Sequence, residues 1–175
     1  MTKIYSLDIE TTGLDPEEYQ ITAIGIGKND DVSSVEVKFV ESPEKEGESI
    51  KWLSEYLEDP SEAVIFTWRP FDFHFIKTRA SDCGVENPLE EAENFDLHEW
   101  IKENEYDGEE IHLEEVMKDF DLEGKYLPGM FMPVFYKLYT ESEKEEDKRK
   151  IVKHCKRDVE GMIEIINQLS DDLLK

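Results

Sequence analysis

The chain has 175 residues, 38% of them hydrophobic, which suffices for a single domain with a core over residues 1–175 and is too little for two. Its 44 acidic and 20 basic residues give a formal charge of −24, which opposes binding of DNA or RNA through a broad basic surface. Adaptation to a high-salt cytoplasm is one explanation for this charge. No apolar run approaches the roughly 20 residues of a membrane span, and Cys83 and Cys155 form no Cys-x-x-Cys pattern, so we expect a cytoplasmic protein with reduced thiols and no membrane partner.

The first predicted element is a strand that starts at Lys3 and runs into a turn at Gly13. Side chains alternate along a strand, so Asp8 and Glu10 share one face while Leu7 and Ile9 point to the other. Two acids beside a core could share a metal ion. The spacing alone is a weak signal, because Asp-x-Glu occurs five times in this acidic chain.

The next elements alternate between strands and helices. Hydrophobic periodicity predicts strands over residues 20–28, 31–40, 63–66 and 95–97, and helices over residues 49–58, 71–83, 98–102 and 113–120. This order predicts an α/β fold in which helices cover a mixed sheet.

The last element is a long helix with one continuous apolar stripe. The stripe comprises Ile151, Val152, Cys155, Val159, Met162, Ile163, Ile166 and Leu169. His154 and Asp158 lie four residues apart at its margin, so both can reach a site at the edge of the core. The same helix holds six basic residues within ten positions. The simplest interpretation is that Glu145 pairs with Arg149 and Glu146 with Lys150 on an ordinary solvated face.

Four acids from three separated segments, Asp8, Glu10, Asp72 and Asp158, form a two-metal arrangement. Their sequence contexts resemble the DEDD superfamily of 3'–5' exonucleases. The three matching stretches, in the family's order, are Leu7-Asp8-Ile9-Glu10-Thr11-Thr12-Gly13-Leu14, Phe71-Asp72-Phe73-His74-Phe75-Ile76 and His154-Cys155-Lys156-Arg157-Asp158-Val159. The resemblance covers nearly the whole chain and implies an RNase H-like fold, a mixed five-stranded sheet with helices on both faces.

The resemblance also implies the chemistry. Asp8, Glu10, Asp72 and Asp158 would bind two divalent ions, Mg²⁺ or Mn²⁺, and His154 would be the general base in hydrolysis at single-stranded DNA or RNA 3' ends. Contacts to the substrate would come from Thr11, Thr12 and the aromatic rings of Trp68, Phe71 and Phe73, on which a base can stack.

Within the superfamily, Leu127-Pro128-Gly129, Pro133, Phe135-Tyr136 and Tyr139 resemble a subgroup of stand-alone prokaryotic RNase H-like exonuclease domains. Two features depart from the family pattern. Trp68 and Thr67 stand where the second motif usually has Asn, and His154 stands at the spacing that the family uses for Tyr.

Each residue also has a simpler interpretation. Asp72 is an acid at a helix start, Trp68 is a core residue, and Met130 and Met132 fill a packing gap. Two alternative functions therefore stay open: a non-catalytic RNase H-like interaction module, and a metal-dependent hydrolase of dinucleotides or small phosphate esters.

Overall fold

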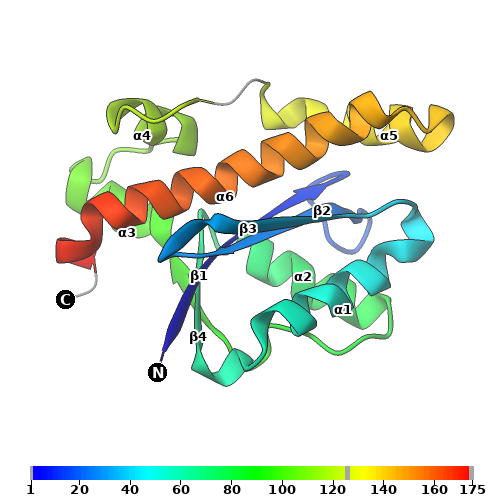
Figure 1. The fold of residues 1–175 in the computed structure, drawn as a ribbon, viewed down its shortest axis with the longest axis horizontal. Coiled ribbons are helices and arrows are strands. Elements are labelled where there is room, and N and C mark those ends of the chain that lie inside the picture. The colour runs from blue at the N-terminus through cyan, green and yellow to red at the C-terminus, as the bar shows by residue number, and fades with distance from the viewer. Residues whose placement is uncertain (1, 125–126, 174–175) are drawn as a thin grey trace.

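A five-stranded sheet forms the centre of the computed structural model, which describes residues 2–124 and 127–173 (Figure 1). Residues 1, 125–126 and 174–175 of the expected domain lie outside the described residues. The sheet order is β3-β2-β1-β4-β5, with β1 (Lys3–Thr11), β2 (Ile21–Lys28), β3 (Asp31–Phe39), β4 (Ala63–Thr67) and β5 (Glu93–Asp96). The first three strands pair antiparallel, and β4 and β5 add in parallel, so the predicted mixed sheet is confirmed.

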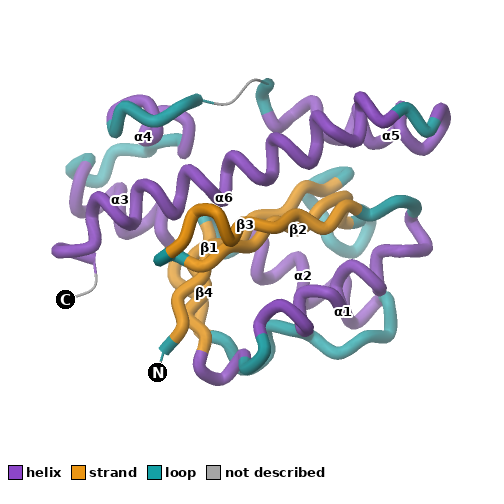
Figure 2. The backbone as a smooth tube through the Cα atoms, viewed as in Figure 1, coloured by secondary structure: helices purple, strands orange, loops and turns teal. Residues whose placement is uncertain are grey.

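Helices cover both faces of this sheet, as expected (Figure 2). The helices are α1 (Glu46–Leu57), α2 (Phe71–Asp82), α3 (Leu97–Glu105), α4 (Leu113–Asp119), α5 (Met132–Ser142) and α6 (Glu145–Leu173). Tyr5, Leu7 and Ile9 of β1 point into the core beneath α1 and α2. The opposite face of β1, β2 and β3 lies against α6, on which α5 packs in turn.

The alternation predicted for β1 explains how one strand serves both a core and a site. Leu7 and Ile9 are buried in the cluster with α1 and α2, so Asp8 and Glu10 face the other way, toward α6. In α6 the predicted stripe is buried, except that Val152 is half-buried. The sheet and α6 thus meet along the surface that carries the acids.

A buried ion pair anchors the loop that joins β1 to β2. The guanidinium of Arg79 on α2 donates to both carboxylate oxygens of Glu46 on α1, at 2.9 and 2.8 Å. Glu46 also accepts from the amide of Ile21 at 2.8 Å, and Arg79 donates to the carbonyl of Pro16 at 3.1 Å. The pair therefore ties both helices to the loop that follows Glu10 and Thr11.

Three details differ from the sequence-based expectations. The first helix begins at Glu46 rather than near residue 49, because the short 3-10 turn Pro43–Lys45 leads directly into it. Residues 132–142 form α5, which the periodicity did not predict as a helix. Met132 fills the core as expected, but the expectation for Met130 is wrong, because its side chain is 77% exposed. Among the described helices, none combines the length and apolarity needed to cross a membrane.

The basic residues of α6 are largely matched by acids on the surface. Lys150 pairs with Glu146 at 3.3 Å, which confirms one of the two predicted pairs. For the other, the structure shows Arg149 donating from Nε to the backbone carbonyl of Glu145 at 3.3 Å.

Candidate active site

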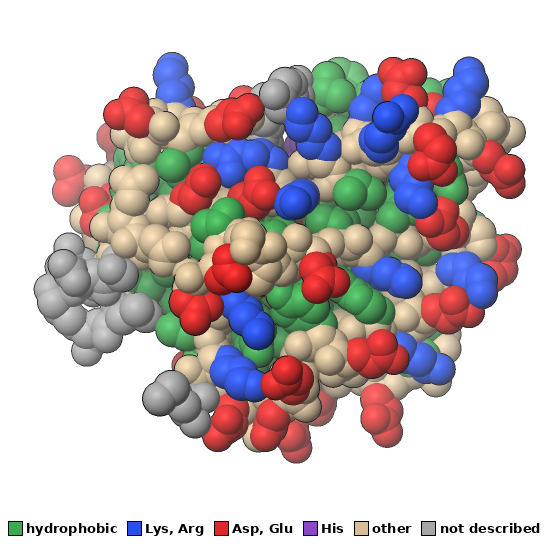
Figure 3. All heavy atoms as spheres, in the orientation of Figure 1, with side chains coloured by type: hydrophobic (Ala, Val, Ile, Leu, Met, Phe, Trp, Pro, Cys, Tyr) green, Lys and Arg blue, Asp and Glu red, His purple; other side chains and the backbone are tan. Residues whose placement is uncertain are grey.

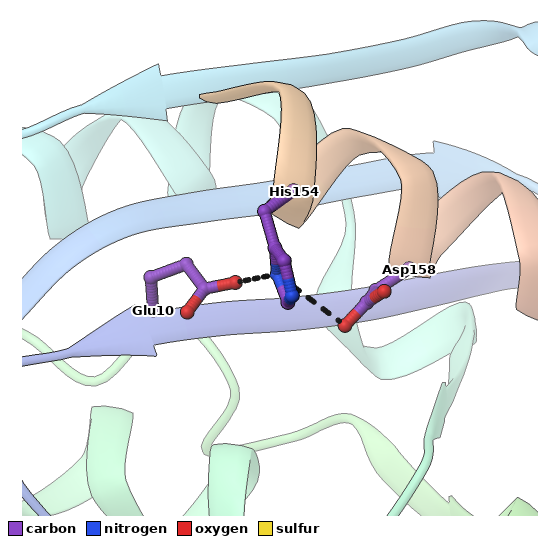
Figure 4. A group of neighbouring side chains, drawn as sticks. All are labelled: Glu10, His154 and Asp158. Atoms are coloured by element: carbon purple, nitrogen blue, oxygen red, sulfur yellow. Dashed lines mark hydrogen bonds and ion pairs between the residues drawn. The ribbon is translucent and has the colours of Figure 1, made fainter. Parts of the chain in front are cut away.

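Two segments that are distant in the sequence, β1 and α6, meet at the end of β1. Glu10 comes from β1, and His154 and Asp158 come from successive turns of α6, so their side chains converge on one point (Figure 4). One ligand atom from each lies within 4.8 Å of the others, and all three side chains are buried. The structure thus brings together three of the five predicted catalytic residues in one contact group.

The imidazole of His154 lies between the two carboxylates. Its Nδ1 is 2.6 Å from Oε1 of Glu10 and 3.8 Å from Oδ2 of Asp158. An ionised carboxylate only accepts hydrogen bonds, so in the contact with an ionised Glu10 the hydrogen would lie on Nδ1. Gly129, at the turn before α5, lies against this ring, since a β-carbon there would be 3.3 Å from Cε1.

Asp72 borders the same group from the first turn of α2. Its Oδ1 accepts a hydrogen bond from the backbone amide of Ile9 at 3.4 Å. Ile9 stands between Asp8 and Glu10 in the sequence, so this bond places Asp72 beside that part of β1. Burial, and to a smaller extent the charges of Glu10 and Asp158, raise the pKa of Asp72 to about 8. Asp72 is therefore an acid at a helix start and also a buried carboxylate close to other acids.

Asp8 is half-buried one residue before Ile9 on the α6 face of β1. The thiol of Cys155 on α6 lies 3.6 Å from the backbone carbonyl oxygen of Asp8. Burial raises the pKa of this thiol, and so do the charges of Asp8, Glu10 and Asp158, which all lie close to it. All four predicted acids therefore share one region between β1, α2 and α6.

This donor set fits divalent metal ions. Four carboxylates in this region repel one another, and the charges of Glu10 and Asp158 add to the effect of burial on the pKa of Asp72. Oxygen ligands of this kind suit Mg²⁺ or Mn²⁺, and a bound cation removes the repulsion by neutralising the acids. Asp8, Glu10, Asp72 and Asp158 are the residues that would hold such ions.

The residues predicted to contact substrate lie around this group, not within it. The Thr11 hydroxyl donates to the carbonyl of Gly13 at 2.6 Å, within its own turn. The Thr12 hydroxyl accepts from the amide of Gln20 at 3.0 Å and lines a surface groove against α5. The Thr11 hydroxyl is thus used within the loop, while Thr12 lines a surface groove.

The three predicted stacking rings are partly buried by protein contacts. Trp68 packs edge to face on His98, with ring centroids 5.3 Å apart. Phe71 packs on Phe75 at 5.2 Å, and Phe73 lies against the core cluster beneath α1 and α2. The simplest role of these rings is packing, which agrees with the interpretation of Trp68 as a core residue.

Two glycines that were not predicted to belong to the site also shape it. Gly25 of β2 is directly opposite Asp8 in the sheet, and Gly129 lies against His154. Both allow a neighbouring element to approach a site residue closely. No local signal distinguishes these glycines, since their partners lie far away in the sequence.

Comparisons with known proteins agree with this architecture. A family model described as RNase_H superfamily matches residues 5–170. An uncharacterized protein of Methanocaldococcus jannaschii is 28% identical over 181 residues, covering 94% of each chain. A family B DNA polymerase from the hyperthermophilic archaeon Pyrobaculum calidifontis has a similar structure, with a TM-score of 0.68 and 16% identity over 97% of this chain.

The likeness to the polymerase is one of fold, because the two sequences are only 16% identical, and this chain spans 25% of the polymerase chain. The family model, in contrast, extends over nearly the whole sequence and includes every residue of the site described above. The chain therefore belongs to the RNase_H superfamily.

Proposed function

We propose that this protein is a metal-dependent 3'–5' exonuclease of the DEDD type, which hydrolyses phosphodiester bonds at single-stranded DNA or RNA ends. The observation that carries the proposal is the convergence of Glu10, His154 and Asp158, with Asp72 beside them. Carboxylates from three elements around one imidazole match the needs of phosphodiester cleavage, namely charge neutralisation and a base. Membership of the RNase_H superfamily and the polymerase-like fold support the same class of chemistry.

The carboxylates and the histidine have different tasks in this proposal. When bound, two divalent ions supply electrostatic stabilisation of the attacking and departing oxygens. Glu10 holds Nδ1 of His154 at 2.6 Å, so the imidazole is fixed in orientation beside the acids, where it would serve as the base toward the attacking water. Imidazole has a reference pKa of about 6.5, which suits proton abstraction near neutral pH better than a phenol near 10.

Burial of the site side chains supports the roles proposed for the carboxylates and for His154. Glu10, His154 and Asp158 are each at least nine-tenths buried, so water has little access around the reacting group. Asp72 is buried as well and shares its environment with Glu10 and Asp158. Electrostatic interactions are stronger in such a site than at the surface.

The test uses 5'-labelled DNA, RNA and dinucleotides with Mg²⁺ or Mn²⁺. Stepwise shortening of the labelled strand marks 3'–5' exonuclease action, immediate release of labelled mononucleotide marks the opposite polarity, and internal fragments mark an endonuclease. Asp8→Asn should abolish the reaction, whereas Glu55→Gln removes an exposed carboxylate and serves as the matched control. Equal activity of Asp8→Asn and the unaltered protein would refute the proposal.

The alternative functions predict other outcomes in the same assay. A non-catalytic interaction module releases nothing from any substrate with either ion. A hydrolase of dinucleotides or small phosphate esters cleaves the dinucleotides and leaves the longer DNA and RNA strands intact.

A further inference from the structure

We infer that the proposed active site acts on short oligonucleotides, which it binds through their bases in an apolar groove rather than through the phosphates of a long strand. The inference rests on the proposed function and names its substrate class. It follows from the groove beside the site, from the side chains exposed around that groove, and from the charge of the protein.

The groove lies between the loop after β1 and the outer side of α5. Its volume is about 440 Å³, and it is lined by Thr12, Pro133, Val134, Tyr136, Lys137 and Thr140. The Tyr136 hydroxyl accepts from the side-chain amide of Gln20 at 3.2 Å, which joins α5 to the loop. Sites for small molecules have volumes of about 300–1,000 Å³, so the groove suits a ligand of nucleotide or dinucleotide size.

The two elements that form the groove are both connected to the candidate active site. Thr12 follows Glu10 by two residues on one side. On the other side, Gly129 contacts His154, and the turn that begins at Gly129 leads directly into α5. The loop and α5 thus connect the groove with the residues that would cleave a ligand bound there.

Apolar side chains are exposed in the groove and on the segments that lead into its elements. Leu14 on the loop is 82% exposed, Met130 before α5 is 77% exposed, and Val134 in the groove is 53% exposed. Apolar groups gathered at a concave surface usually mark a binding site. A base can pack against such apolar groups without regard to sequence, so the groove offers base contacts in place of charge.

The charge of the protein disfavours long strands. The chain has a net charge of −24, and a strand gains one negative charge with each added nucleotide. On the face drawn in Figure 3, the basic side chains are interspersed with acidic ones. In the basic cluster of α6, Lys148 pairs with Glu41 and Arg157 pairs with Glu164, so these cations are already matched.

The groove itself has a charge that fits a short ligand. Lys137 is the one basic residue among the side chains that line it. One ammonium group matches the single phosphodiester of a dinucleotide. Each further phosphate would extend over a surface that is acidic overall, so repulsion grows with chain length.

The first test is a length series of one sequence, with 2, 3, 5, 10 and 20 nucleotides as the probes. We expect kcat/KM to be highest for the two shortest and at least tenfold lower at 20 nucleotides. For the dinucleotide, the logarithm of kcat/KM should change little with the logarithm of salt concentration, whereas binding through Z phosphates gives a slope of about −0.7Z for single strands.

A value of kcat/KM that rises with length, or a steep negative salt slope, would overturn the inference and leave the proposed function intact. Absence of metal-dependent cleavage at every length would instead overturn the proposed function. The two failures are therefore distinguishable in one experiment.

The second test uses matched variants on the same helix. Val134→Asp places a charge in the groove, while Leu138→Asp places the same charge on an exposed position of α5 that does not line it. We expect Val134→Asp to raise KM for the dinucleotide about tenfold with little change in kcat, and Leu138→Asp to leave both constants near their original values. Fluorescence anisotropy of a labelled dinucleotide, with each substitution added to Asp8→Asn, measures the same effect on binding without turnover. Equal effects of the two variants would contradict the groove as the binding site.

Discussion

Cys155 of α6 lies directly over Gly25 of β2, the residue paired with Asp8 in the sheet. A β-carbon at Gly25 would be 2.8 Å from Sγ of Cys155 and 3.0 Å from Cγ2 of Val159. The absence of a side chain at this position lets α6 approach the sheet closely. That approach brings His154 and Asp158, which flank Cys155 and Val159 in the sequence, to Glu10.

Gly25→Ala should therefore both destabilise the protein and disturb the site. Overpacking of this kind costs about 1–3 kcal/mol, measured as the free energy of unfolding in urea. Cys155→Ala in the same chain should restore most of the loss, because it removes the clashing sulfur. Gly124→Ala, where a β-carbon meets nothing within 4 Å, should behave like the unaltered protein. A stable Gly25→Ala variant would show that α6 can shift without cost.

The raised pKa of Asp72 predicts a pH dependence of the metal-free protein. Its ordinary pKa of 3.8 rises to about 8 in the folded state, mainly through burial. Between about pH 4 and 8 the folded protein keeps a proton that the unfolded chain has lost, so this contribution to stability is complete below pH 4 and disappears toward pH 8. Asp72→Asn should flatten the decline in unfolding free energy measured with chelator present, while Asp30→Asn, at an exposed position, should not. Parallel curves for Asp72→Asn and the unaltered protein would contradict the prediction.

Breaking the buried Glu46–Arg79 pair should be far more costly than breaking a surface pair. Arg79→Met leaves the carboxylate of Glu46, whose side chain is 3% exposed, without its bidentate partner. Loss of one member of a buried pair costs about 3–5 kcal/mol. Lys45→Met removes the exposed Lys45–Glu48 pair and should cost less than about 1 kcal/mol. Urea unfolding of both variants checks the difference, and equal costs would mean that water reaches Glu46.

Divalent ions should raise the melting temperature. An ion that binds only the folded state stabilises it by about 2.7 kcal/mol at one hundred times its dissociation constant. Mn²⁺ should have this effect on the unaltered protein and on Glu55→Gln, but much less on Asp158→Asn, because Asp158 belongs to the buried group around His154. Scanning fluorimetry measures the shift. The same shift in Asp158→Asn would place the ion elsewhere.

The sequence was sufficient to predict the elements that carry the site. Alternation in β1 separates Asp8 and Glu10 from the core, and the stripe of α6 orients His154 and Asp158, because both patterns are local and set by backbone geometry. The start of α1 was misplaced because Glu46 is an acid at a buried position, and its burial depends on Arg79, 33 residues away. Periodicity contains no signal for such a pair.

The groove and the close approach of α6 were beyond prediction for a related reason. Gly25 matters because of Cys155, and Gly129 matters because of His154, so each depends on a partner from another element. Met130 was expected to pack inside, since its apolar side chain is compatible with a core, but it lies exposed before α5. Side-chain character alone does not tell which apolar groups a fold leaves at its surface.

The position of His154 and Asp158 in the interior of α6 has a consequence for motion. Helices fray from their ends, and both residues stand well inside a 29-residue helix that packs on the sheet. Their backbone amides should therefore be among the slowest in the protein to exchange hydrogen with solvent. Assembly and loss of the candidate site would then coincide with folding and unfolding of the whole molecule. Motions that admit a ligand would instead involve the loop after β1 and α5.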